Sequence, residues 1–349
     1  MPERHKPEFI TLLFGIESTV VSSSSSSAAS SRLSTPPSSR AKRGICSSFT
    51  ACLLSLVTVL CPSASGQRRP DRPKITRIDH VAIYASDLKA TRDFYAKLGL
   101  NEGGAGCVRG IQNCFTVNWA TRQRIELEPS SSCPNNDCLG EIVFRTANAQ
   151  KLRNVLVARG IKASPIERYL NVSMKFEAQD PEGHRIGFVQ ILSIPVDDPP
   201  PGIAAGFGHI IHAGFVVHDR AAMEKFYRDI LGFRPYWHGG MKDDQIDWVS
   251  LQVPDGTDWI EFMVNVPPDA DHRLLGVMNH IALGVPDIHA AAKQLLTNGM
   301  KLTEEPKIGR DGKRQLNLYD PDQTRVELME FTPVEKPCCS DYTGPHPKP

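Results

Sequence analysis

The stretch His280-Ile-Ala-Leu-Gly-Val-Pro-Asp287 is a short apolar run followed by an aspartate. The same pattern occurs three more times, starting at His80, Glu141 and His212, with Asp or Asn again seven positions later. Asp and Asn suit a helix N-cap there, because their side-chain oxygen accepts a hydrogen bond from a free backbone N–H. Glycines suited to a left-handed C-cap follow 12 or 13 positions further on, at Gly99, Gly160, Gly232 and Gly299. The chain is therefore a fourfold repeat.

Each repeat ends in a strand-like segment whose comparable position lies 46 to 49 residues after its first residue. That position holds Glu126, Gly187, Glu261 and Glu327 in repeats one to four. Repeats one, three and four therefore pair a histidine with a glutamate, and repeat two does not. A single strand histidine is usually a hydrogen-bonded structural residue, so the recurrence at equivalent positions is what indicates a site.

The periodicities within a repeat follow a fixed order. In repeat three, an apolar strand from His212 precedes a helix in which Met223, Phe226 and Ile230 recur at helical spacing, and three strand-like segments follow. One βαβββ module exposes a sheet face and must pair with another. We therefore predict an α+β fold of four βαβββ modules forming two half-closed eight-stranded barrels. In the C-terminal pair, four equivalent positions converge, which are His212, Glu261, His280 and Glu327.

The composition is that of a globular chain. Its 349 residues, 40% hydrophobic and 23% charged, can form one or two cores. A formal net charge of +1 and the lack of a basic stripe argue against a nucleic-acid partner. No apolar run reaches the roughly 18 residues of a spanning helix, so we expect no membrane span in the mature form. Edge pairing between such half-barrels would allow a homodimer.

The first 70 residues differ in composition from the rest. Residues 22–40 are mostly Ser, Ala and Pro, which cannot form a core. A basic segment ending at Arg43 then precedes an apolar segment, 49–60, and small residues up to Gly66, which is the order of an export signal. We expect residues 1–70 to be a Ser-rich leader and signal peptide and the protein to be secreted or periplasmic. Because the second half of this leader has no acidic residue, organelle targeting is the alternative.

Cysteine use agrees with export. Six cysteines follow the leader, at Cys107, Cys114, Cys133, Cys138, Cys338 and Cys339. An even number in an exported chain favours disulfides. The turn-rich segment between Cys133 and Cys138 would close a small ring, so we expect this pair, together with Cys107 and Cys114. A zinc site is the alternative, although the spacing is not that of paired CxxC knuckles.

A proline-rich segment divides the repeats two and two. Proline fixes the backbone and removes hydrogen-bond donors, so we interpret residues 196–206 as a linker. The N-terminal domain then spans 72–195 and the C-terminal domain 207–332. The tail, 333–349, has no periodicity and is expected on the surface or disordered.

Four segments carry a resemblance to a known family. They are Ile78-Asp-His-Val-Ala-Ile-Tyr84, Arg92-Asp-Phe-Tyr95, Phe226-Tyr-Arg-Asp-Ile-Leu-Gly-Phe233 and Asp320-Pro-Asp-Gln-Thr-Arg-Val-Glu-Leu-Met-Glu330. These segments resemble the vicinal oxygen chelate superfamily, which includes glyoxalase I, bleomycin-resistance proteins and extradiol ring-cleaving dioxygenases. The resemblance covers about residues 76–331, nearly the whole mature chain.

The resemblance implies a metal site. In metal-binding members, the first-strand histidine and last-strand glutamate of paired modules hold a divalent ion. The implied metal ligands here are His212, Glu261, His280 and Glu327, and the implied ion is Fe, Mn, Ni, Co or Zn. Such an ion would act as a Lewis acid on adjacent oxygens of a small-molecule substrate. Glu327 is the implied catalytic residue, a carboxylate that moves a proton beside a chelated carbonyl.

The N-terminal pair departs from this pattern. Repeat one offers His80 and Glu126, but repeat two offers Glu141 and Gly187. With one histidine and one carboxylate lost, we predict a scaffold with a degenerate site. A weak or altered site that uses His80, Glu126 and Glu141 is the alternative.

Three functions compete. The first is an exported, glyoxalase-like isomerase or lyase that acts on a small oxygen-chelating substrate. The second is an Fe(II) extradiol-type ring-cleaving dioxygenase, which would use only two histidines and one glutamate. The resemblance also implies a further histidine before its last strand, and none occurs between Asn298 and Glu327. The third is a non-enzymatic small-molecule binding protein, against which the paired metal ligands argue.

Overall fold

The computed structural model of the chain describes residues 71–103, 107, 113–169, 172–193 and 208–349. The predicted leader, 1–70, and the predicted linker, 196–206, lie outside the described residues. We call the described residues up to 193 the N-terminal half and those from 208 onward the C-terminal half.

Four βαβββ modules follow one another, as the repeat predicts. The first consists of β1 (Ile75–Ala85), α1 (Leu88–Lys97), β2 (Asn101–Glu102), β3 (Cys114–Asn118) and β4 (Gln123–Pro129). After the short η2 (Pro134–Asn136), the second consists of β5 (Leu139–Thr146), α2 (Ala149–Ala158), β6 (Glu167–Tyr169), β7 (Ser173–Gln179) and β8 (Arg185–Ile191). The third consists of β9 (Ile210–Val216), α3 (Arg220–Glu224) continued by η3 (Lys225–Ile230), β10 (Arg234–Gly239), β11 (Trp248–Gln252) and β12 (Trp259–Met263). After an added α4 (His272–Met278), the fourth consists of β13 (His280–Val285), α5 (Ile288–Thr297), β14 (Lys307–Ile308), β15 (Arg314–Tyr319) and β16 (Arg325–Glu330).

The helices begin and end at the residues that the repeat marks. Asp87 accepts a hydrogen bond from Ala90 N at the start of α1, and the same cap is formed by Asn148, Asp219 and Asp287. The glycines that close the helices have positive φ, between +78° and +86°, in all four modules. Since only glycine adopts this conformation without strain, both predicted signals are confirmed.

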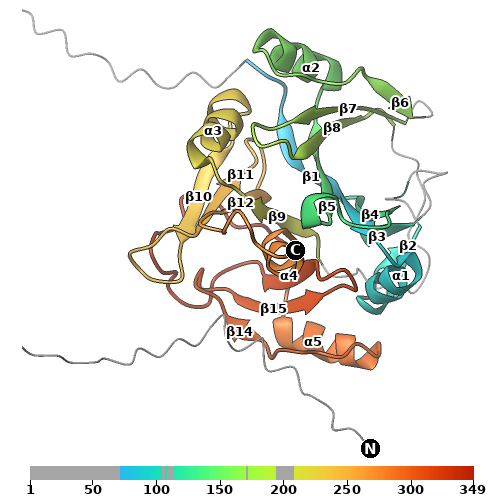
Figure 1. Cartoon of the computed structure of the whole chain (residues 1–349), viewed down its shortest axis with the longest axis vertical. Coiled ribbons are helices and arrows are strands. Elements are labelled where there is room, and N and C mark those ends of the chain that lie inside the picture. The colour runs from blue at the N-terminus through green and yellow to red at the C-terminus, as the bar shows by residue number, and fades with distance from the viewer. Residues whose placement is uncertain (1–70, 104–106, 108–112, 170–171, 194–207) are drawn as a thin grey trace, which may run out of the picture. The chain divides into compact units, whose positions relative to one another are not determined.

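The strands form two eight-stranded sheets, with the orders β2-β3-β4-β1-β5-β8-β7-β6 and β10-β11-β12-β9-β13-β16-β15-β14. In each sheet the first strands of two modules pair antiparallel at the centre, and each first strand pairs in parallel with the last strand of its own module. The helices α1, α2, α3 and α5 lie outside the strands (Figure 1). The predicted fold class is thereby confirmed.

The two halves share one apolar core. A single cluster of buried side chains includes Ile78 and Phe144 from the N-terminal half and Phe233 and Ile260 from the C-terminal half. At the junction, the Gln123 amide donates to the carbonyls of Ile78 (2.8 Å) and Ile210 (3.0 Å). The halves therefore pack as one body.

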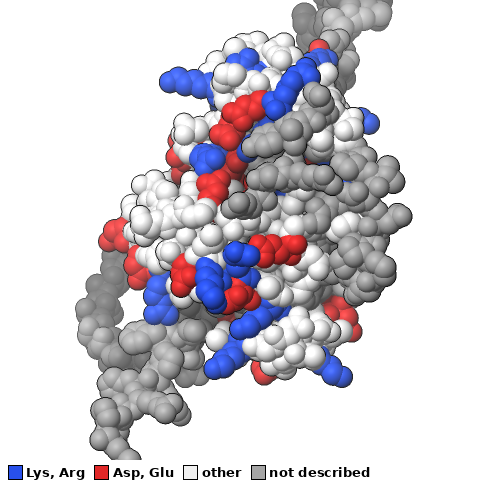
Figure 2. Space-filling view, turned by 90° about the vertical axis from the view of Figure 1, so that its right-hand side faces the viewer, with Lys and Arg blue, Asp and Glu red and all other residues white. Residues whose placement is uncertain are grey.

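The surface carries charges of both signs. Acidic and basic side chains are interspersed on the face shown in Figure 2. Among the described residues, no helix has the length and apolar character needed to cross a membrane.

The structure pairs the cysteines that follow the leader. Cys107 is bonded to Cys114 and Cys133 to Cys138, the two predicted pairings. A third bond joins the adjacent Cys338 and Cys339 in the tail, a pairing that the spacing did not indicate.

Candidate metal centre

The register of the second sheet places the four predicted ligands in two neighbouring rows. Ala282 pairs with His212 on one side and Glu327 on the other. Gly214 in turn pairs with His280 on one side and Glu261 on the other. A Cβ atom on Gly214 would collide with the His280 ring, so this position requires glycine. The central strands thus bring the four side chains to one face of the sheet.

Three of these side chains meet at a point. The Nε2 atoms of His212 and His280 are 3.0 Å apart. Glu327 Oε2 lies 3.6 Å from the first of these nitrogens and 3.7 Å from the second. Glu261 stands at the edge of this cluster, because its Oε2 is 3.7 Å from His280 Nε2 while its Oε1 accepts a hydrogen bond from Ser250 Oγ (3.1 Å).

The donor set suits a divalent metal ion. His280 Nδ1 donates to the carbonyl of Met278 (2.8 Å), which leaves its Nε2 lone pair directed at the cluster. Burial lowers the pKa of both imidazoles, so they are neutral, which is the metal-binding form. Burial also raises the pKa of Glu327 to about 7 and that of Glu261 to about 8. A divalent cation would supply the positive charge that these buried carboxylates lack. Imidazole and carboxylate ligands fit Fe, Mn, Ni, Co or Zn.

The tail lies on the surface, one of the two expected alternatives, and packs beside this site. Trp259 stacks on the His212 ring with 4.6 Å between centroids, and Tyr236 packs beside Trp259. Tyr342 of the tail packs on Tyr236 and donates from its hydroxyl to the Asp311 carboxylate (3.1 Å). Aromatic rings on strands β10 and β12 supply the packing surface, which the lack of periodicity in the tail could not reveal.

Two buried cations beside the cluster were not identified from the sequence. Lys313 Nζ is fully buried and lies 4.4 Å from the ring centroid of Trp259, and it has no hydrogen-bond partner among the described residues. Arg325 Nη1 lies 3.8 Å from Glu327 Oε2. Arg325 precedes Glu327 by two on a strand, so the period of two could have placed it on the same face. Lys313 directly follows a glycine turn, and no pattern indicates it.

In the N-terminal half, protein cations contact the equivalent residues. Arg124 donates to Glu126 Oε1 (2.6 Å), and its guanidinium lies 3.3 Å from His80 Nε2. Lys175 donates to Glu141 Oε2 (2.7 Å). A Cβ atom on Gly187 would lie 2.5 Å from Glu141 Oε1, so a side chain there would displace this glutamate. These groups are therefore held by ion pairs within the protein.

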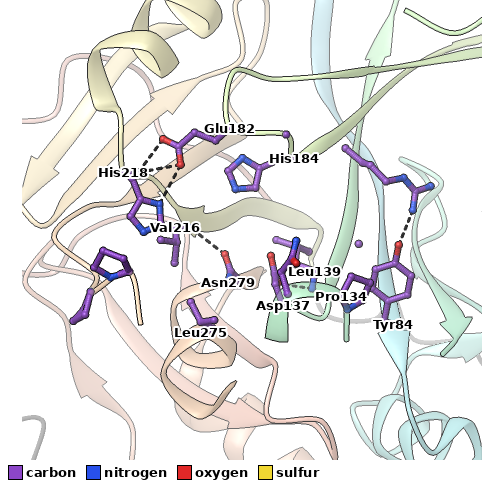
Figure 3. A pocket seen from close by; sticks show the side chains of 16 residues that line it. Tyr84, Pro134, Asp137, Leu139, Glu182, His184, Val216, His218, Leu275 and Asn279 are labelled. Atoms are coloured by element: carbon purple, nitrogen blue, oxygen red, sulfur yellow. Dashed lines mark hydrogen bonds and ion pairs between the residues drawn. The ribbon is translucent and has the colours of Figure 1, made fainter. Parts of the chain in front are cut away.

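A pocket of about 380 Å³ lies away from the cluster and is lined by residues of both halves. Figure 3 shows Glu182 directed at His218, with Tyr84 on the opposite side of the pocket. Arg185, which also lines the pocket, donates to the Tyr84 hydroxyl (2.9 Å). None of the four predicted metal ligands lines this pocket.

Comparisons with known proteins agree with the fold. The family model described as "Glyoxalase/Bleomycin resistance protein/Dioxygenase superfamily" matches residues 209–328, which include all four predicted ligands. Residues 209–328 belong to this superfamily. A lactoylglutathione lyase of Haemophilus influenzae is 28% identical over 123 residues, which are 35% of this chain and 91% of the relative.

Solved structures of the superfamily extend the likeness to both halves. The 2,3-dioxygenase LapB of Pseudomonas sp. KL28 is 16% identical, with a TM-score of 0.57 over 79% of this chain and 95% of the other. A catechol 2,3-dioxygenase is also 16% identical, with a TM-score of 0.56 over 79% and 96% of the two chains. At this identity the likeness establishes the fold alone.

Proposed function

We propose that the chain is a metal-dependent enzyme of the vicinal oxygen chelate superfamily that works at the C-terminal cluster. The observation that carries this proposal is the convergence of two neutral imidazoles and a carboxylate, His212, His280 and Glu327, at 3.0 to 3.7 Å. The substrate is a small molecule with two adjacent oxygens, and the reaction is a glyoxalase-like isomerisation or lyase reaction. The superfamily match over residues 209–328 supports this reading.

The residues of the cluster have different roles in the proposed reaction. A divalent ion bound by His212, His280 and Glu327 would supply Lewis-acid polarisation of adjacent substrate oxygens. Glu327 Oε2 is the base, and it accepts a proton from the carbon beside the polarised carbonyl and returns it to the neighbouring carbon. Trp259 covers one face of the His212 ring.

One observation favours a second candidate, an Fe(II) extradiol-type dioxygenase. The ligand atoms of His212, His280 and Glu327 all lie within 4.8 Å of one another, and Glu261 is not part of that group. Two histidines and one carboxylate form the facial triad of non-haem iron oxygenases. In this case Glu261, held by Ser250, would act on the ligands from outside the coordination sphere.

The Glu261→Gln variant separates the two candidates. If Glu261 is a fourth ligand, the variant should lose affinity for Fe(II), Mn(II) and Zn(II) nearly as strongly as His212→Ala. If Glu261 lies outside the coordination sphere, the loss should stay within about 10-fold to 100-fold. Titration of metal-free full-length chain measures both, and Glu126→Gln is the matched control in the N-terminal half.

Turnover by the metal-loaded chain then tests the reaction. The lyase proposal expects conversion of a 2-oxoaldehyde thiol adduct without oxygen uptake. The dioxygenase candidate expects oxygen uptake with a catechol and Fe(II). A chain that binds no metal at these residues contradicts the enzyme proposal and favours a binding protein.

Export is proposed from the leader sequence. The basic, apolar and small-residue order before Gly66 supports removal of the leader and a mature chain that begins near Gln67. Sequencing the N-terminus of the protein from its native source tests this. A chain that retains residues 1–66 contradicts it.

A further inference from the structure

Arg325 lies against the candidate metal centre. Its Nη1 is 3.8 Å from Glu327 Oε2, which is the oxygen that faces both imidazole nitrogens. Only 12% of the Arg325 side chain is exposed. A guanidinium keeps its positive charge when buried, so Arg325 places a permanent cation beside Glu327 in the cluster.

The donors of Arg325 are incompletely used. Nη1 donates to Asn317 Oδ1 over 3.4 Å, a long hydrogen bond. Nε is buried and has no hydrogen-bond acceptor among the described residues. A buried N–H without an acceptor costs free energy, and an acceptor that arrives with a ligand removes this cost.

The repeat supplies a natural comparison. Arg185 stands two residues before Gly187, as Arg325 stands two before Glu327. Arg185 donates to Tyr84 Oη (2.9 Å) and lies 3.5 Å from Glu128 and 3.8 Å from Glu141. The two arginines thus occupy equivalent positions, but Arg185 lies near two carboxylates, whereas among the described residues Arg325 has only Glu327 within ion-pair distance.

The balance of charge also favours an anion. The carboxylates of Glu261, Glu327 and Asp311 interact with the cations Arg325, Lys307 and Lys313. A divalent ion added to this group leaves an excess of positive charge. Because buried net charge is costly, a ligand with one negative charge would stabilise the filled site.

We propose that Arg325 binds a carboxylate of the substrate and that the substrate is a 2-oxo or 2-hydroxy carboxylate. This inference rests on the proposed function, since the metal must be present. One carboxylate oxygen and the neighbouring oxo or hydroxyl oxygen would chelate a bound ion, and the other carboxylate oxygen would accept hydrogen bonds from Arg325. Because the guanidinium lies beside Glu327 Oε2, an anionic group bonded directly to the chelating carbon would be within its reach.

Binding of two matched probes tests this proposal. Lactate and lactamide offer the same chelating oxygens, but only lactate carries the negative charge. We would titrate both into Co(II)-loaded full-length chain and follow the visible spectrum of the ion. Wild type should bind lactate more tightly than lactamide. Arg325→Met should weaken lactate binding by about 10-fold to 100-fold and lactamide binding by less than about 3-fold, as expected for loss of a charge-assisted hydrogen bond.

Two further variants define the role. Arg325→Lys should recover part of the lactate affinity, because it keeps the charge and loses the fork geometry. Arg185→Met, the matched control, should leave the binding of both probes unchanged. Co(II) affinity should be the same in Arg325→Met as in wild type.

The outcomes separate the two proposals. If Arg325→Met binds lactate as tightly as wild type does, the substrate inference is overturned and the metal site stands. If Arg325→Met loses Co(II), Arg325 positions Glu327 instead of binding substrate, which also overturns the inference. If wild type binds no Co(II), the proposed function fails and the inference fails with it.

Discussion

In the C-terminal half, His212, His280 and Glu327 face one another, whereas in the N-terminal half the equivalent residues face the cations of Arg124 and Lys175. Two substitutions make much of this difference. Arg124 stands where the C-terminal half has Trp259, and Lys175 stands where it has Gln315. Two repeated halves can therefore keep the same fold while differing in what balances their buried carboxylates. Arg124 and Lys175 do so in the N-terminal half, and a bound metal ion is proposed to do so in the C-terminal half.

The largest effect is expected from loss of a C-terminal imidazole. His280→Ala should lower metal affinity by about 1,000-fold or more, beyond the 10-fold to 100-fold range of changes outside the coordination sphere. His80→Ala, at the equivalent position of repeat one, should leave metal affinity unchanged. Metal titration of both variants by calorimetry makes the comparison. An equal loss in the two variants would show that the N-terminal half also binds metal.

Removal of the Lys175 ammonium group should destabilise the N-terminal half. Lys175→Met leaves Glu141, which is 2% exposed, without its nearest partner. We expect the free energy of unfolding to fall by about 3 kcal/mol, because the buried Glu141 then keeps only the more distant Arg185 (3.8 Å) as a cationic partner. Lys151→Met, which removes an exposed ion pair with Asp71, is the control and should change it by less than about 1 kcal/mol. Urea unfolding measures both, and equal small losses would contradict the role assigned to Lys175.

A third contrast lies in the turns before the last strands. Asp180 Oδ2 is paired with His184 and Tyr227, whereas Asp320 Oδ2 is buried without a partner among the described residues. Burial raises the pKa of Asp320 from 3.8 to about 7. The folded state then holds a proton that the unfolded state releases, so stability is fully present below pH 4 and is lost as pH rises through 7.

The Asp320→Asn variant tests this contrast, because asparagine resembles the protonated form. Between pH 5 and pH 7, wild type should lose about 2 kcal/mol of stability relative to Asp320→Asn. Asp180→Asn should give no such pH-dependent gain, since the Asp180 carboxylate is used by His184 and Tyr227. Unfolding curves at several pH values measure the difference, and a constant gap between wild type and Asp320→Asn would refute it.

The smallest effect concerns the tail, which contacts the C-terminal sheet. Tyr342→Phe removes the hydroxyl that donates to Asp311 and keeps the ring on Tyr236. We expect a loss of about 1 kcal/mol in stability, the usual worth of one hydrogen bond. Thermal unfolding measures it. No change would indicate that ring packing and the hydrogen bonds of the tail with β10 hold it without this hydroxyl.

The sequence alone determined the repeat and its local structure. The helix cap follows the start of the strand by seven residues, and the glycine follows the cap by 12 or 13. These signals can be recognised in the sequence because a cap depends only on backbone groups a few residues away. The order βαβββ and the placement of His212, Glu261, His280 and Glu327 on one face of a sheet followed from equivalence between repeats. Equivalent positions on first and last strands must meet when the modules pair.

Only the tertiary structure decided which atoms are neighbours in the site. Glu261 stands apart from the triad because Ser250, on the adjacent strand, takes one of its oxygens. Lys313 and the tail reach the site through packing on Trp259 and Tyr236, and such contacts between distant segments leave no periodic signal. Which side chains contact each other in the site depends on the direction in which each side chain leaves its strand. The sequence therefore determined where the four predicted ligands lie in the sheet. Tertiary packing determined which groups each of them contacts.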